Sequence, residues 1–274
     1  MKPVILLIFL PLIVKSIRVK LKDNLVLDNG DTQWKSWFKQ RSFDVFLGIP
    51  YAEPPLGNLR FTLPKKFRSE KSELYVGENP DLNPYYGSTC TQMNFNEELE
   101  GTEDCLHLNI YAPKIPEITQ KLPVMVWIHG GGFFAGSSSP SFYGPDYFMD
   151  YNVILVAINY RLGPLGFLTL ENDEMPGNLG MHDQILALQW VQENIGRFNG
   201  DPENVTIIGE SAGAMAVMFL VMSHLSEGLF ARAIIQSGPI VSSYTKWDKK
   251  PRLYALRLAQ DLGKGVHGMV QKCV

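Results

Sequence analysis

The sequence has little net charge, no long apolar run and no internal repeat, and each absence removes a class of protein. Its 274 residues carry a formal charge of −3, which gives no reason to expect nucleic acid or an anionic membrane as a partner. The apolar run at residues 4–14 is too short for a membrane span, which needs roughly 20 residues. No low-complexity linker divides the chain, and 45% hydrophobic content is ample for one large core.

The first residues are typical of a secretory signal. Lys2 precedes the short apolar run, and the triplet Val14-Lys15-Ser16 is an acceptable cleavage site. We therefore predict a signal peptide at residues 1–16 and a product that is secreted or held in the secretory-pathway lumen.

The pentapeptide Gly209-Glu210-Ser211-Ala212-Gly213 places a serine between a strand and a helix. The apolar, β-branched residues 205–208 read as a buried strand, and residues 214–222 read as a helix. Strand, tight turn and helix form the setting of a nucleophile elbow, in which small residues flank the serine because strand and helix nearly touch. An ordinary glycine-rich turn is the alternative, but the flanking pattern and a second motif favour Ser211 as a nucleophile.

That second motif, His129-Gly130-Gly131-Gly132, follows the apolar run at residues 124–128. Consecutive glycines let the backbone aim N–H groups at the oxyanion of an acyl-transfer reaction. We predict that Gly131, Gly132 and Ala212 supply these donors, and that His129 orients the loop. A phosphate-binding loop is the alternative, but neither Gly-Lys-Ser/Thr nor Gly-x-Gly-x-x-Gly spacing follows.

With these motifs the chain resembles the N-terminal portion of the type-B carboxylesterase and cholinesterase family of α/β-hydrolases. The resemblance runs through further motifs in order: residues 46–55, 57–61, 103–111, 159–163, 177–184 and 200–206. It implies an α/β-hydrolase domain at residues 17–263 that is partial, since family members are longer, and a divergent tail at residues 264–274.

The periodicity agrees with that fold class. Short apolar strands are predicted at residues 122–128, 153–159, 205–209 and 233–236, and an amphipathic helix at residues 183–198. Strands alternating with helices predict a mostly parallel sheet with helices on both faces. A short antiparallel edge is expected within residues 20–40.

The resemblance also implies a scaffold. It pairs Cys90 with Cys105 in a disulfide, which leaves Cys273 as an odd thiol. It pairs Arg60 with Glu103 and Arg161 with Asp183, all four in structural roles.

Two further positions have open interpretations. Glu210 either tunes the electrostatics of the nucleophile or is a structural carboxylate. Asn204 begins a glycosylation sequon, yet Val205 begins a predicted buried strand, so both outcomes stay open.

A serine nucleophile needs a histidine base and a carboxylate. After Ser211 only His224 and His267 remain, with three acids, Glu227, Asp248 and Asp261. His224 comes thirteen residues after Ser211, on or just after the same helix, and His267 lies where the resemblance has stopped. We expect neither to reach the serine, and hence a truncated chain with an incomplete triad.

Three interpretations follow. The first is a serine carboxylesterase, without metal or cofactor, that hydrolyses a small-molecule carboxylic ester. The second is a non-catalytic cholinesterase-like binding or adhesion module, which the retained Ser211 disfavours. The third is a fragment with no stable fold.

The loop from Cys90 to Cys105 contains no tryptophan, so an uncharged, apolar ester that suits Phe133 and Phe134 is favoured over a quaternary ammonium.

Overall fold

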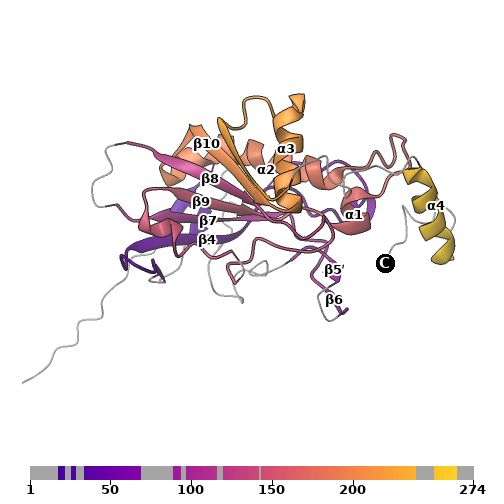
Figure 1. The fold of residues 1–274 in the computed structure, drawn as a ribbon, viewed down its shortest axis with the longest axis horizontal. Helices are drawn as coiled ribbons and strands as arrows, with labels where there is room; N and C mark the ends of the chain where they lie inside the picture. Colours follow the sequence, from indigo (N-terminus) through magenta and orange to yellow (C-terminus); the bar gives the residue numbers. More distant parts are fainter. Residues whose placement is uncertain are drawn as a thin grey trace, which may run out of the picture.

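A seven-stranded sheet forms the centre of the computed structural model (Figure 1). The structure describes residues 18–21, 26–28, 34–68, 89–93, 97–115, 120–141, 143–238 and 250–263. The predicted signal peptide and the divergent tail lie outside these ranges.

The sheet joins a parallel half to an antiparallel half. Its strand order is β11-β10-β8-β9-β7-β4-β3. The strands are β3 (Trp34–Lys35), β4 (Ser42–Pro50), β7 (His107–Pro113), β8 (Leu122–Ile128), β9 (Ile154–Ile158), β10 (Gly200–Glu210) and β11 (Arg232–Gln236). Strands β9, β8, β10 and β11 run parallel, whereas β7, β4 and β3 follow in antiparallel pairing. Two small antiparallel pairs lie outside it: β1 (Arg18–Lys20) with β2 (Val26–Asp28), and β5 (Gln92–Met93) with β6 (Leu99–Glu100).

Alternation along the strands sends side chains to two different cores. In β8, Val124, Val126 and Ile128 are fully buried in the larger core, under α2 (Leu179–Asn194) and α3 (Ala212–Met222). Figure 1 shows these two helices together over one face of the sheet. Met125 and Trp127 point to the opposite face, because successive strand residues face opposite sides.

The opposite face carries a second apolar cluster with residues from both halves of the sheet. There the short helix η2 (Phe148–Asp150) buries Met149 against this cluster, which includes Phe43, Tyr111 and Leu155. The remaining helical elements are α1 (Gly163–Phe167), α4 (Pro251–Asp261), η1 (Gly57–Leu59), η3 (Ile195–Phe198) and η4 (His224–Ser226).

The four predicted strands are all present and form the parallel half of the sheet. Strand β10 is longer than expected and begins at Gly200, and the predicted helix at residues 183–198 begins four residues earlier and ends as η3. Strands β1, β2 and β3 supply antiparallel pairing in or next to residues 20–40, as expected. Strands β4 and β7 were not predicted.

Candidate active site

Ser211 occupies the junction between β10 and α3 in a strained backbone conformation. Its φ of +54° and ψ of −122° lie in a region that side-chain-bearing residues rarely adopt. Its backbone N–H donates to the Gln236 carbonyl oxygen at 2.9 Å, which fixes the turn to β11. The side chain is half-buried. A strained turn of this kind between strand and helix is the conformation that exposes the side chain of a nucleophile at the end of a strand.

The two glycines of the pentapeptide are required by close backbone approaches. A Cβ placed on Gly209 would lie 2.4 Å from the carbonyl oxygen of Gly213, and one on Gly213 would lie 2.1 Å from that of Ile128. Real Cβ atoms do not tolerate such contacts with backbone. Helix α3 therefore sits directly on the ends of β10 and β8, as the spacing of the motif predicts.

The glycine loop after β8 lies against the serine turn. Gly131 and Gly132 have positive φ values, +105° and +63°, and the N–H groups of Phe134 and Ala135 both donate to the Gly131 carbonyl oxygen. Within the described residues, the N–H groups of Gly131, Gly132 and Ala212 make no hydrogen bond. An unpaired backbone N–H is a donor that a ligand can use, so the prediction that these three groups form an oxyanion hole stays a prediction.

The buried His129 ring contacts the backbone of this loop. Its ring is 1% exposed and stacks on Tyr160 at 4.3 Å, and the Tyr160 hydroxyl donates to the His129 carbonyl oxygen at 2.8 Å. Its Nδ1 lies 2.8 Å from the Gly130 carbonyl oxygen, which can only accept, so Nδ1 carries the hydrogen. Burial lowers the pKa of His129 to about 4, against the opposing effect of that hydrogen bond. The ring is neutral at neutral pH, and the geometry supports an orienting role.

Glu210 borders both the serine and the glycine loop. Its carboxylate oxygen Oε2 would lie 3.3 Å from a Cβ on Gly130, and its side chain is half-buried. The pKa of Tyr143 is raised mainly by burial and further by the charge of Glu210. Both interpretations of Glu210, as a group that tunes the nucleophile and as a structural carboxylate, stay open.

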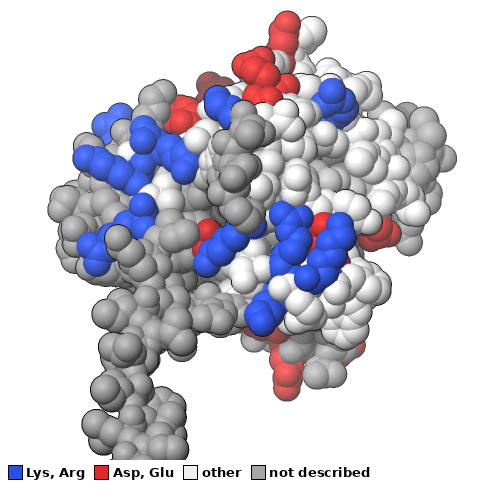
Figure 2. Space-filling model, turned by 90° about the vertical axis from the view of Figure 1, so that its left-hand side faces the viewer, with Lys and Arg blue, Asp and Glu red and all other residues white. Residues whose placement is uncertain are grey.

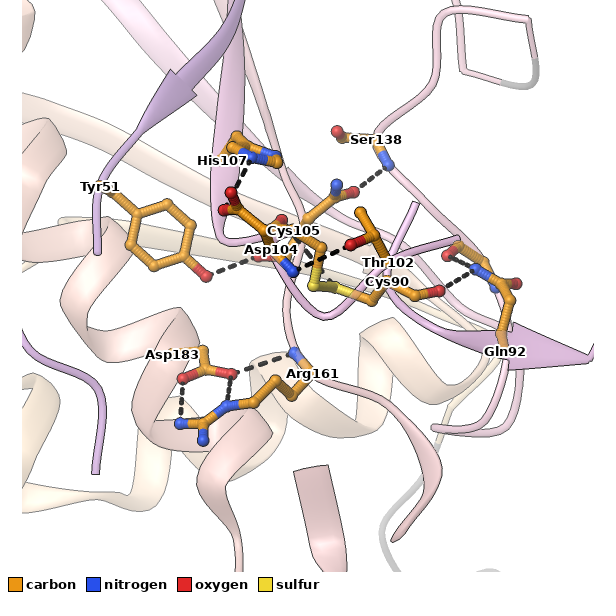
Figure 3. Close-up of a disulfide and its surroundings, with 12 residues drawn as sticks. Tyr51, Cys90, Gln92, Thr102, Asp104, Cys105, His107, Ser138, Arg161 and Asp183 are labelled. Atoms are coloured by element: carbon orange, nitrogen blue, oxygen red, sulfur yellow. Dashed lines mark hydrogen bonds and ion pairs between the residues drawn. A yellow bond between two sulfur atoms is a disulfide. The ribbon is translucent and has the colours of Figure 1, made fainter. Parts of the chain in front are cut away.

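Two ion pairs and a disulfide hold the scaffold, and Figure 3 shows the disulfide together with the Arg161–Asp183 pair. Arg161 Nη2 donates to Asp183 Oδ1 at 2.7 Å, and the two side chains are 3% and 0% exposed. The same guanidinium donates to the carbonyl oxygen of Arg60, whose own side chain pairs with Glu103 at 2.7 Å. The expected disulfide joins Cys90 to Cys105, with Cα atoms 5.0 Å apart. Both expected pairs are therefore present.

Within the described residues, no histidine makes a hydrogen bond to the Ser211 side chain. His224 lies in η4, beyond the far end of α3, and is exposed. Eleven helical residues at about 1.5 Å each separate it from the serine by roughly 16 Å. His267 and Asp248 lie outside the described ranges. Within them, the Ser211 hydroxyl has no hydrogen-bond partner.

An apolar cavity of about 600 Å³ opens beside the glycine loop. Its wall combines that loop with residues from α1, α2, α3 and η4: Gly132, Phe133, Phe134, Gly163, Phe167, Asn178, Met181, His182, Ile185, Phe219, Leu220, Ser223 and Leu225. Ser211 is not among them, and the predicted oxyanion-hole residue that borders the cavity is Gly132. Of these, the sequence analysis named only Gly132, Phe133 and Phe134 as site residues. The other residues converge through tertiary packing, for which the sequence carries no local signal.

Three other expectations concern modification, metals and membranes. Asn204 lies within β10, half-buried, and its Oδ1 accepts a hydrogen bond from Arg232 at 2.6 Å. Its glycosylation stays a prediction. In the part of the chain that the structure describes, no cluster of His, Cys, Asp and Glu could hold a metal ion. No described helix is long and apolar enough to span a membrane.

Comparison with known proteins gives a consistent family. The sequence model of the Carboxylesterase family matches residues 29–273. The juvenile hormone esterase of Tribolium castaneum is 47% identical over 209 residues, which cover 75% of this chain and 34% of that protein. Acetylcholinesterase 1 of Caenorhabditis elegans is 44% identical over 224 residues, covering 78% of this chain and 35% of that protein.

A solved structure agrees with the fold. The juvenile hormone esterase of Manduca sexta, crystallised with OTFP covalently attached, superposes with a TM-score of 0.82 at 31% identity and covers 94% of this chain and 49% of that one. The chain spans only about a third of the length of the two curated relatives. The chain belongs to the Carboxylesterase family and has the α/β-hydrolase fold.

Proposed function

We propose that this chain carries the nucleophile and oxyanion hole of a serine carboxylesterase. The observation that supports this proposal is the strained Ser211 turn, which packs against a glycine loop whose N–H groups at Gly131 and Gly132 make no hydrogen bond to other described residues. Ser211 Oγ attacks the ester carbonyl carbon as its proton passes to a base, and the carbonyl electron pair moves onto oxygen. Collapse of this intermediate expels the alcohol, which takes up the proton, and leaves an acyl-enzyme that water hydrolyses.

The oxyanion would be held by Gly131, Gly132 and Ala212. Each preorganised donor in such a hole contributes about 3–4 kcal/mol to the transition state. His129 supports the hole by fixing the Gly130 carbonyl away from the reacting oxygen, through the hydrogen bond from Nδ1. Glu210 would contribute negative potential beside the nucleophile.

We propose that the base and its carboxylate come from outside the described residues. His224 is at the wrong end of α3, so proton transfer from Ser211 has no partner there. We propose that the 274 residues alone form an incomplete triad and a feeble esterase. The residual rate comes from the oxyanion hole and substrate binding.

The cavity beside Gly132 suits an apolar acyl chain. Aromatic and aliphatic side chains form most of its wall, and the loop closed by the disulfide offers no indole face to a cation. The proposed substrate is therefore an uncharged carboxylic ester.

We further propose that the protein enters the secretory pathway through residues 1–16 and is glycosylated if Asn204 becomes accessible.

A binding module without catalysis is the second candidate, because the described residues include no base for Ser211. Assays of p-nitrophenyl acetate and p-nitrophenyl hexanoate hydrolysis distinguish the esterase from the binding module. We expect slow turnover above background that the Ser211→Ala variant loses, with the hexanoate preferred. Ile185→Trp, which narrows the cavity, should reduce that preference. Equal rates for the parent and Ser211→Ala would favour the binding module.

A further inference from the structure

Four large aromatic side chains are exposed around the turn between β3 and β4 at the edge of the sheet: three have rings near one another, and the fourth, Tyr151, lies under the Lys39 ammonium of the same turn. Trp37, Phe38, Tyr147 and Tyr151 are 63%, 72%, 59% and 67% exposed. The Tyr147 ring lies 6.3 Å from that of Trp37 and 5.7 Å from that of Phe38. We call these four residues the aromatic patch. Single exposed apolar residues are ordinary, whereas several exposed aromatic rings gathered around one turn are a feature of interaction sites.

The turn that presents the patch is rigidly held. The carboxylate of Asp150, only 3% exposed, accepts hydrogen bonds from Ser36 Oγ at 2.6 Å, Lys39 N–H at 2.8 Å and Phe38 N–H at 3.1 Å. The side-chain amide of Gln40 donates to the Trp37 carbonyl oxygen at 2.9 Å. Because the backbone is already fixed, the exposed rings meet a partner with little further loss of backbone entropy.

Cationic side chains border the aromatic patch. Lys35 and Lys39 are exposed, and the Lys39 ammonium lies 5.1 Å from the centre of the Tyr151 ring. Arg41 donates to the carbonyl oxygen of Asp150 and to Asn152. The Asp150 carboxylate faces the inside of the turn, and half-buried Asp146 is the neighbour of Tyr147 in the sequence. Figure 2 shows groups of Lys and Arg across this face, with Asp and Glu mostly toward its rim.

The aromatic patch lies at the opposite end of the sheet from Ser211. Ser211 follows the carboxyl end of β10, whereas Tyr151 comes shortly before the amino end of β9, and both strands belong to the parallel half. The five residues of β9 alone span about 16 Å. Figure 1 shows the turn before β4, in indigo, at the left-hand end of the sheet. A partner on this patch would leave the mouth of the site open.

We propose that the aromatic patch docks the protein onto an anionic phospholipid membrane. Trp and Tyr rings favour the interface between headgroups and acyl chains, and Lys and Arg are attracted to anionic headgroups. The overall charge of −3 does not oppose this, because the attraction acts within about 10 Å of the surface at ordinary salt. Docking attaches the protein to the membrane with the Ser211 end facing away. It is independent of whether Ser211 is catalytic.

Vesicle sedimentation with the full chain tests the proposal. We expect binding to vesicles of phosphatidylcholine mixed with phosphatidylserine, and weaker binding to phosphatidylcholine alone or at high salt. The Trp37→Ala/Phe38→Ala variant should bind about tenfold more weakly or worse, since it removes two interfacial rings. Leu99→Ala is the matched control, because Leu99 is 73% exposed in β6, away from the patch. It should bind like the parent.

Brominated lipids give a readout that a merely structural change would not mimic. They should quench tryptophan fluorescence in the parent, and the quenching should be lost in Trp37→Phe, which keeps an aromatic ring and the other four tryptophans. Three outcomes would overturn the proposal: no binding to either vesicle, equal binding by the double alanine variant, or an oligomer of the parent that this variant converts to monomer. The last would show that a second copy of the chain occupies the patch.

Discussion

Gly130 packs directly against Ser211. A Cβ on Gly130 would lie 3.2 Å from the Ser211 Cβ and 2.7 Å from the Glu210 carbonyl oxygen. Two motifs about eighty residues apart in the sequence thus meet because β8 and β10 are parallel neighbours whose carboxyl ends coincide. Because no side chain larger than the hydrogen atom of glycine fits at position 130, the proposed oxyanion hole can keep this geometry only with glycine there.

A methyl group at position 130 tests whether the glycine loop needs this close contact. Gly130→Ala should push the glycine loop away from Ser211, since the close neighbour is backbone, and should slow phosphonate labelling of Ser211 about 100-fold. Gly196→Ala is the control, because nothing lies within 4 Å of a Cβ at Gly196. Labelling rates followed by mass spectrometry, with thermal midpoints beside them, separate the two. Equal rates in both variants would show that the loop does not shape the site.

The buried ion pair gives a prediction of stability. Asp183→Asn leaves the Arg161 guanidinium buried with its charge unpaired, so the free energy of unfolding should fall by about 3–5 kcal/mol. Lys66→Ala removes an ion pair with Glu193 that is largely open to solvent, and should cost less than about 1 kcal/mol. Urea unfolding of both variants is the measurement. A similar small loss in each would mean that Arg161 finds other partners.

The burial of His129 predicts a loss of stability on acidification. Its pKa is about 4 in the folded protein and 6.5 when unperturbed, so only the unfolded chain takes up the proton between these values. Stability is therefore complete above pH 6.5 and falls toward pH 4, by about 3 kcal/mol from this group. Burial also lowers the pKa values of His107 and His182, which add to the slope.

Urea titrations across this pH range measure the effect. His129→Gln should be less stable overall, because it loses the stacking on Tyr160, and its stability should depend less on pH. An unchanged slope in this variant would assign the acid sensitivity to other groups.

The sequence predicted the parallel half of the sheet better than the antiparallel half. Strands β8 and β9 are short, apolar and bounded by turns, so their pattern alone identifies them. Strand β4 contains a register shift between Phe46 and Ile49, with Gly48 at a φ of +66°. Its second half is buried throughout, so it lacks the alternation that marks a strand.

The candidate site also has a part that the sequence predicts and a part that it does not. The Ser211 turn and the glycine loop have local signatures, because steric demands fix the residue type at each position. The apolar cavity is built by Phe167, Ile185 and Phe219 from three helices, and the aromatic patch by turns about 110 residues apart. Such sites depend on long-range packing, which no short pattern records.

Covalent labelling tests the central claim most directly. The purified chain, incubated with a fluorophosphonate and digested, should carry the phosphonyl adduct on Ser211, slowly because no described histidine activates it, and Ser211→Ala should carry none. Fast stoichiometric labelling that His267→Ala abolishes would contradict the incomplete triad. An adduct spread over other serines, with none on Ser211, would contradict the nucleophile itself.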